Sequence, residues 1–80
     1  MFFVYILFSE NLNKFYVGST QNLESRFLQH NRGKTPFTKS GIPWKLIHII
    51  PLNTRSEAIQ LETKIKNRGI ERYLKDINYF

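Results

Sequence analysis

Two short segments near the start of the chain, residues 2–8 and 14–19, limit its fold more than any other feature. Both are rich in Phe, Val, Ile and Tyr, the residue types that favour β-strands. The polar stretch ENLNK between them is typical of a turn. We therefore expect a β-hairpin in which each strand carries one tyrosine, Tyr5 and Tyr16.

The middle of the chain predicts a helix, a loop and a third strand. Asn22 is suited to cap a helix, and Gly33 to end it. Residues 33–43 contain two Gly and two Pro, which indicates a loop. Residues 44–52 (WKLIHIIPL) are β-rich with little alternation, so we expect a strand covered on both faces and stopped by Pro51.

The last third predicts two helices. Thr54 and Glu57 have the spacing of a capping box, and Gly69 breaks the helix that follows. Residues 70–77 favour a final short helix. The order is thus β-β-α-β-α-α, and we predict one α/β (α+β) domain over residues 1–80, with a three-stranded antiparallel sheet flanked by helices.

Composition narrows the possible functions. The chain has 80 residues and no cysteine, so neither disulfides nor thiolate zinc sites are expected. No stretch approaches the ~20 apolar residues that span a bilayer. The opening MFFVYILF lacks a basic start and a cleavage site, which favours a strand over a signal peptide. We expect a cytoplasmic protein without a membrane partner or a small-molecule cofactor.

Positive charge is concentrated in the middle of the chain. The net charge is +6, and residues 14–45 hold six Lys or Arg against Glu24 alone. Such a surface attracts polyanions such as nucleic acid. The alternative is that the charge serves solubility only.

Glu62 lies on or beside the apolar stripe of the helix that Thr54 caps. It completes an i, i+3, i+4, i+7 set with Ala58, Leu61 and Ile65. A carboxylate there loses solvation unless it is paired or binds a cation. The alternative reading places Glu62 at the edge of the stripe, paired with Lys66 at i+4.

Arg26 and His30 are four residues apart and so share one helix face. Arginine is well shaped to hold a phosphate, and histidine moves protons near neutral pH. The alternative is a solvated basic face. Together with the tyrosines and Glu62, however, this pair suits phosphodiester cleavage, which needs a cation for developing charge, a proton acceptor and a metal ligand.

These motifs resemble those of the GIY-YIG nuclease superfamily. Its Gly-Ile-Tyr stands here as FVY (residues 3–5) and its Tyr-Ile-Gly as YVG (residues 16–18). TQNLESRFLQHN is similar to the family's first helix, PWKLIH to its third strand, and SEAIQLETKIK to the helix that bears the metal-ligand glutamate. The likeness covers residues 2 to about 66 and is that of a small single-domain bacterial member.

The resemblance implies an active site of five side chains. One of the two tyrosines, Tyr5 or Tyr16, would activate or orient the water. Arg26 would steady the pentacovalent phosphate, and His30 would hydrogen-bond the phosphate or help move the proton. Glu62 would bind one divalent cation, Mg²⁺ or Mn²⁺, since carboxylate, water and phosphate oxygens suit a hard ion.

Some positions depart from the family pattern or carry weaker expectations. Phe3 and Val4 replace packing residues, and Ser19 begins a stretch where some relatives carry a lysine. Gly18 would let backbone or substrate approach closely. We expect Phe37 to anchor its loop rather than stack on a base. Trp44 and His48 are expected in the core. Weaker candidates for phosphate contacts, or merely solvated residues, are Lys34, Thr38, Lys39 and Lys66.

We therefore predict a metal-dependent endonuclease that hydrolyses DNA phosphodiester bonds, with a place in DNA repair or recombination. One alternative is a nucleic-acid-binding module that keeps the nuclease fold but cleaves little. A second is a protein-interaction domain. The sequence leaves open the preferred DNA structure, the tyrosine that acts as base and the oligomeric state.

Overall fold

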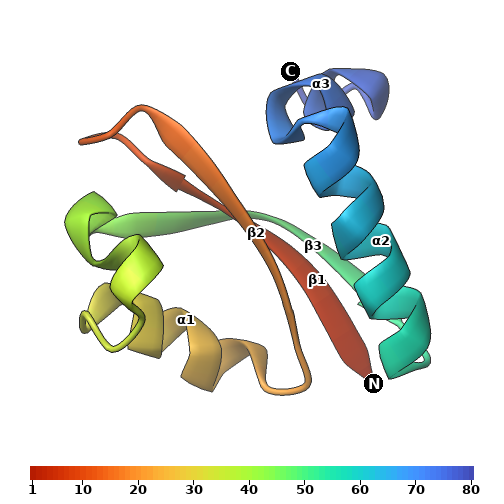
Figure 1. The fold of residues 1–80 in the computed structure, drawn as a ribbon, viewed down its shortest axis with the longest axis horizontal. Helices are drawn as coiled ribbons and strands as arrows, with labels where there is room; N and C mark the ends of the chain where they lie inside the picture. The colour runs from red at the N-terminus through yellow and green to blue at the C-terminus, as the bar shows by residue number, and fades with distance from the viewer.

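The computed structural model describes residues 1–80 and contains the predicted hairpin. Strand β1 (Phe2–Ser9) pairs antiparallel with β2 (Lys14–Thr20), with Tyr5 opposite Gly18 and Ile6 opposite Val17. Strand β3 (Trp44–Leu52) pairs antiparallel with the other side of β1, so the sheet order is β2-β1-β3 (Figure 1). The predicted three-stranded antiparallel sheet is confirmed.

The helices begin and end at the residues that the sequence indicated. The Asn22 side chain accepts a bond from the Ser25 amide at the start of α1 (Leu23–Asn31). Helix α2 (Arg55–Arg68) opens with the Thr54–Glu57 capping box and stops at Gly69, whose φ is 94°. Helix α3 (Ile70–Asp76) follows directly. The predicted element order β-β-α-β-α-α is confirmed.

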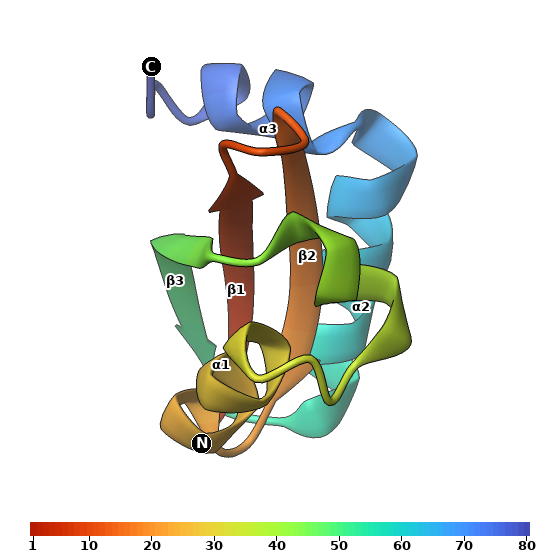
Figure 2. The ribbon, with the colours of Figure 1, turned by 90° about the vertical axis from the view of Figure 1, so that its left-hand side faces the viewer.

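Strand alternation divides the molecule into two small cores. Side chains of even number on β1 and of odd number on β2 face α2 and α3. Together with side chains of α2 and α3 they form a cluster of Val4, Ile6, Val17, Ala58, Ile65 and Leu74. The opposite face carries Tyr5, Leu7 and Trp44 and is covered by α1 and the short 3₁₀ helix η1 (Pro36–Gly41). Figure 2 shows α1 and η1 in front of the sheet and α2 behind it.

Four sequence expectations about the middle of the chain are wrong. Residues 33–43 are not only loop, because they contain η1. Strand β3 is an edge strand with Ile49 exposed, so it is not covered on both faces. Pro51 does not stop it: Pro51 pairs opposite Phe3, and an edge strand tolerates a residue without an amide proton. Phe37 does not anchor the loop, because it is 90% exposed.

Two further expectations concern β3. Trp44 is buried, as predicted, whereas His48 is only partly buried and lies beside the ring of Tyr79.

None of the helices is both long and apolar enough to cross a membrane.

Candidate active site

The hairpin brings both tyrosines to the face of the sheet that α1 covers. Tyr5 is almost completely buried, and its hydroxyl lies 2.9 Å from Nε2 of His30. The ring of Tyr16 lies 5.0 Å from the imidazole and 6.4 Å from the ring of Tyr5, measured between centroids. Three of the sequence-predicted side chains therefore form one cluster.

The buried hydrogen bonds of His30 define its tautomer. The Thr38 hydroxyl donates its one proton to the Thr35 carbonyl at 3.2 Å, so it accepts the 2.8 Å bond from His30 Nδ1–H. His30 Nε2 is then the acceptor, and the hydroxyl of Tyr5 donates to it. Both ring nitrogens are engaged within the protein, which leaves neither of them free to hydrogen-bond a phosphate.

Gly18 makes room for the ring of Tyr5. A Cβ at this position would lie 2.5 Å from the Tyr5 hydroxyl oxygen and 2.7 Å from Cζ, far inside van der Waals contact. Gly18 stands opposite Tyr5 in the ladder, so the phenol crosses directly over its backbone. The close approach expected at Gly18 is therefore made by the side chain of Tyr5, and not by backbone or substrate.

Arg26 holds a buried donor without a partner. Its Nε atom is inaccessible and makes no hydrogen bond, while Nη1 donates to Gln29 at 3.4 Å. An unpaired buried donor costs about 1–3 kcal/mol. Such a cost in the free protein marks Arg26 as a side chain whose position is not explained by hydrogen bonding alone.

Burial sets the protonation states of the cluster. It raises the pKa of Tyr5 to about 12, and the nearby guanidinium of Arg26 opposes only part of that rise. Burial also lowers the pKa of His30, and the charge of Arg26 lowers it further. At neutral pH the phenol of Tyr5 is therefore protonated and the imidazole of His30 is neutral.

Glu62 approaches the cluster from α2, across the free edge of β2. Its Oε1 accepts a 2.6 Å bond from the Ser19 hydroxyl, and its Oε2 lies 2.7 Å from Nζ of Lys66. The Glu62 side chain is 20% exposed. The pairing with Lys66 that the sequence offered as an alternative therefore exists, and Lys66 is an ion-pair partner rather than a free surface charge.

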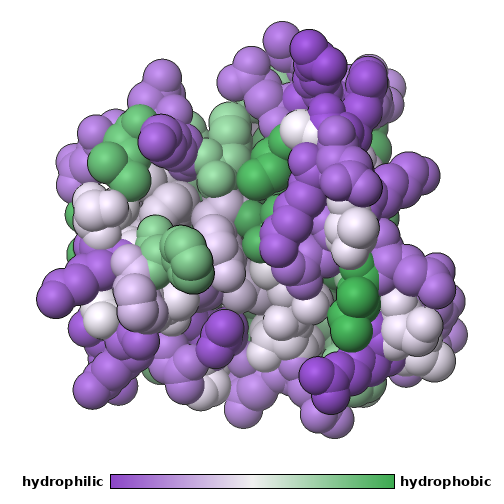
Figure 3. Space-filling model, in the orientation of Figure 1, coloured by the Kyte–Doolittle hydropathy of each residue, from purple (hydrophilic) through white to green (hydrophobic).

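The hydrogen bond from Ser19 places Glu62 beside β2, the strand that also carries Tyr16. Figure 1 shows this strand between α1 and η1 on one side and α2 on the other. In Figure 3 the surface between the two sides is pale in its lower part and green, hence hydrophobic, in its upper part, and hydrophilic side chains border it along α2. The charge of Glu62 is the smallest of the causes that raise the pKa of Tyr5.

The residues present would suit a hard divalent cation that keeps several of its water ligands. No group of three or more His, Cys, Asp or Glu side chains gathers anywhere in the chain. A single, partly exposed carboxylate fits Mg²⁺, which keeps several waters and takes its other ligands from phosphate oxygens. Glu62 is the side chain that would hold such an ion, in exchange for the ammonium of Lys66.

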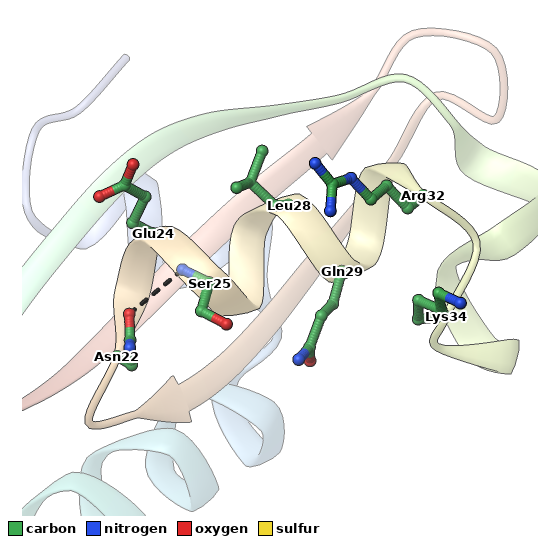
Figure 4. Close-up of a pocket in the computed structure, with 7 residues that line it drawn as sticks. All are labelled: Asn22, Glu24, Ser25, Leu28, Gln29, Arg32 and Lys34. Carbon is green, nitrogen blue, oxygen red and sulfur yellow. Dashed lines mark hydrogen bonds between the residues drawn. The ribbon is translucent and has the colours of Figure 1, made fainter.

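The remaining lysine candidates lie outside this cluster. Lys34 lines a hollow of about 710 Å³ along the outer side of α1, where Figure 4 shows it near Arg32 and Gln29. None of Tyr5, Tyr16 and Glu62 lines that hollow. Lys39 is exposed on η1.

Two residues of the site had not been assigned these roles from the sequence. Thr38 was considered only as a phosphate contact, yet it is fully buried and bonded to His30. Ser19 was noted only because it replaces a lysine, yet it binds Glu62. Neither contact leaves a sequence signal, because each depends on how two separate elements pack against one another.

Comparison with known proteins places the chain in a family. The family model described as the GIY-YIG catalytic domain matches residues 1–75, and the chain belongs to this family, which is a nuclease superfamily. Proteins of this superfamily generally use divalent metal ions.

Several individual proteins are similar to this chain. A UPF0213 protein of Staphylococcus haemolyticus is 36% identical over 76 residues, which cover 94% of this chain and 92% of the relative. A UPF0213 protein of Syntrophus aciditrophicus is 38% identical over 66 residues, covering 80% and 75%. The solution structure of a UPF0213 protein from Bacillus halodurans has the same fold, with a TM-score of 0.61 at 23% identity, covering 99% of this chain and 85% of that one.

Proposed function

We propose that this chain is a metal-dependent endonuclease that hydrolyses phosphodiester bonds in DNA. The observation that carries the proposal is the cluster of Tyr5, Tyr16 and His30 beside Arg26, whose buried Nε lacks a partner. Membership of a nuclease superfamily and the net charge of +6 support it. A place in DNA repair or recombination remains a prediction.

The two tyrosines take different parts in this proposal. Tyr5 is too deeply buried to meet a solvent water, and its hydroxyl is already committed to His30. Tyr16 is partly exposed beside the same imidazole, so it is the side chain that orients the attacking water and, in its phenolate form, accepts that water's proton. Tyr5 and His30 then act as a proton-sharing pair that fixes the geometry around Tyr16.

Arg26 and Glu62 deal with the charge of the phosphate. The guanidinium of Arg26 binds the non-bridging oxygens and stabilises the negative charge that develops there. The carboxylate of Glu62 holds the divalent cation, which supplies Lewis-acid polarisation of the phosphate when bound. Ser19 keeps that carboxylate in place through its 2.6 Å hydrogen bond.

The test is incubation of the purified chain with supercoiled, nicked, branched and single-stranded DNA, with Mg²⁺, Mn²⁺ or a chelator. We expect nicking that needs the metal, and its loss in Glu62→Ala and Arg26→Ala. Glu71→Ala and Arg72→Ala, which alter exposed residues of α3, are matched controls and should cut like the wild type. Thermal melting must show that every variant folds.

One observation favours a second function, a DNA-binding module with little cleavage. Both oxygens of Glu62 are already engaged, by Ser19 and Lys66, and no other carboxylate joins them. This alternative predicts DNA binding that weakens steeply with salt and no cutting at any metal concentration. The same set of DNA substrates distinguishes the two functions.

A further inference from the structure

Helix η1 is firmly attached to the candidate active site. Thr38 is completely buried within it, and its hydroxyl bonds to His30 at 2.8 Å. The Trp44 indole donates to the Thr38 carbonyl at 2.6 Å. The same ring lies over Gly41, where a Cβ would be only 2.3 Å from it. The backbone around Thr38 is therefore fixed in space relative to the imidazole.

Phe37 immediately precedes this anchor and points away from the protein. It is 90% exposed, more than any other large hydrophobic residue of the chain. The next most exposed, Met1 and Phe80, are the two terminal residues. Phe37 is therefore an exposed aromatic ring on a well-anchored backbone. It is adjacent in sequence to Thr38, which binds His30.

The charge around Phe37 indicates what covers it. Lys34 and Lys39 are exposed on either side of it in the chain, and no acidic residue occurs between Glu24 and Glu57. A partner with phosphates for the lysines and a flat π-face for the ring fits this surface. Single-stranded nucleic acid offers both, because its backbone carries the phosphates and its unpaired bases expose their π-faces. Proteins that bind it combine basic residues with aromatic side chains.

We propose that Phe37 stacks on an unpaired nucleobase of the DNA substrate, close to the phosphate that is cut. Within a duplex both faces of a base are covered by its neighbours, so only a flap, tail or frayed end leaves a face free for the ring. The inference rests on the proposed nuclease function and adds a substrate class to it: DNA in which a duplex meets a single-stranded segment.

The test measures binding without cleavage, in chelator, on two probes of equal length. One is a blunt duplex, and the other carries a single-stranded tail with 2-aminopurine at successive positions. The wild type should bind the tailed probe more tightly and quench the fluorescence at one or two positions. Phe37→Ala should lose about ten-fold in affinity for the tailed probe and the quenching, and should bind the blunt duplex like the wild type. Phe37→Trp should restore both.

The control is Phe80→Ala, which removes the other strongly exposed phenylalanine and should change neither signal. Equal binding of the tailed probe by wild type and Phe37→Ala would overturn the inference. So would a wild-type dimer in sedimentation that Phe37→Ala converts to monomer, because the ring would then cover a second copy. If the wild type cuts DNA but Phe37 has no effect on binding, only this inference fails. If it neither binds nor cuts, the proposed function fails as well.

Discussion

The hydroxyl of Tyr5 donates a 2.9 Å hydrogen bond to Nε2 of His30, and the Thr38 hydroxyl accepts from Nδ1 of the same ring. This buried chain of three side chains joins β1, α1 and η1. It fixes the imidazole beside Tyr16 and leaves it neutral, and the predictions below follow from it and from its neighbours across β2.

Replacing Tyr5 by Phe removes one end of this chain. His30 Nε2 then loses its donor in a dry environment, so we expect a loss of about 1–2 kcal/mol in the free energy of unfolding. DNA cleavage should fall with it, because the imidazole is no longer held. Urea denaturation and nicking assays measure the two effects. Tyr73→Phe, which alters a tyrosine of α3, should leave nicking unchanged, and a Tyr5→Phe variant as active as the wild type would contradict the assigned role.

Acid should destabilise the fold through His30. Its pKa lies below the ordinary value of about 6.5 because it is buried, so the unfolded chain takes up the proton more readily. The free energy of unfolding should therefore decrease as the pH falls from about 6.5 to 5. This dependence should flatten in His30→Gln and persist in His48→Gln. Denaturation curves at each pH test this prediction. If the free energy of unfolding of His30→Gln depended on pH as steeply as that of the wild type, His30 would not be the cause.

Gly18→Ala should damage both stability and cleavage. The new Cβ collides with the Tyr5 ring, which is held by its bond to His30 and has little freedom to move. Overpacking of this kind costs about 1–3 kcal/mol. Gly33→Ala is the comparison: its φ of 75° brings backbone strain, but its Cβ meets nothing closer than 3.6 Å. Gly33→Ala should retain nicking, whereas normal nicking by Gly18→Ala would show that the Tyr5 position is unimportant.

Arg26→Met should separate stability from activity. The variant keeps the apolar stem and removes the buried Nε that lacks a partner, so the free energy of unfolding should stay the same or rise by up to about 1 kcal/mol. Nicking should fall at least ~100-fold, since the positive charge over the phosphate is gone. Arg72→Met should alter neither quantity. A large loss of stability in Arg26→Met would indicate a structural role instead.

Lys66 should compete with the divalent cation for Glu62. Its ammonium lies 2.7 Å from Oε2, but 57% of the side chain is exposed, which keeps the pair weak. We expect Lys66→Ala to bind Mn²⁺ about two- to five-fold more tightly, as measured by electron paramagnetic resonance of the free ion. Lys64→Ala removes a neighbouring charge that forms no ion pair with Glu62, and should have a smaller effect. Equal changes in both variants would leave no special role for Lys66.

Much of the fold and part of the site could be predicted from local patterns. Period-two alternation places Tyr5, Tyr16 and Gly18 on one face once the hairpin is recognised, and helix spacing places Arg26 beside His30. The caps at Asn22 and Thr54 are local as well. These features depend on residues a few positions apart, where spacing alone decides geometry.

The remainder depends on packing between elements, which no local pattern predicts. Thr38 meets His30 only because η1 folds back onto α1, and a loop rich in Gly and Pro gives no sign of that. Phe37 was expected to anchor its loop, yet its side chain is exposed and the buried residue is its neighbour Thr38. Ser19 and Glu62 are 43 residues apart, so their bond is a product of sheet and helix packing.

The rate of plasmid nicking against Mn²⁺ concentration, in the wild type and in Glu62→Gln, examines the account most directly. Glutamine keeps the size of the side chain and removes the charge that holds the cation. We predict saturable, chelator-sensitive nicking in the wild type and at least ~100-fold slower nicking in Glu62→Gln with an unchanged melting temperature. A folded wild type that cuts no DNA with either metal, or a Glu62→Gln variant that cuts equally fast, would contradict it.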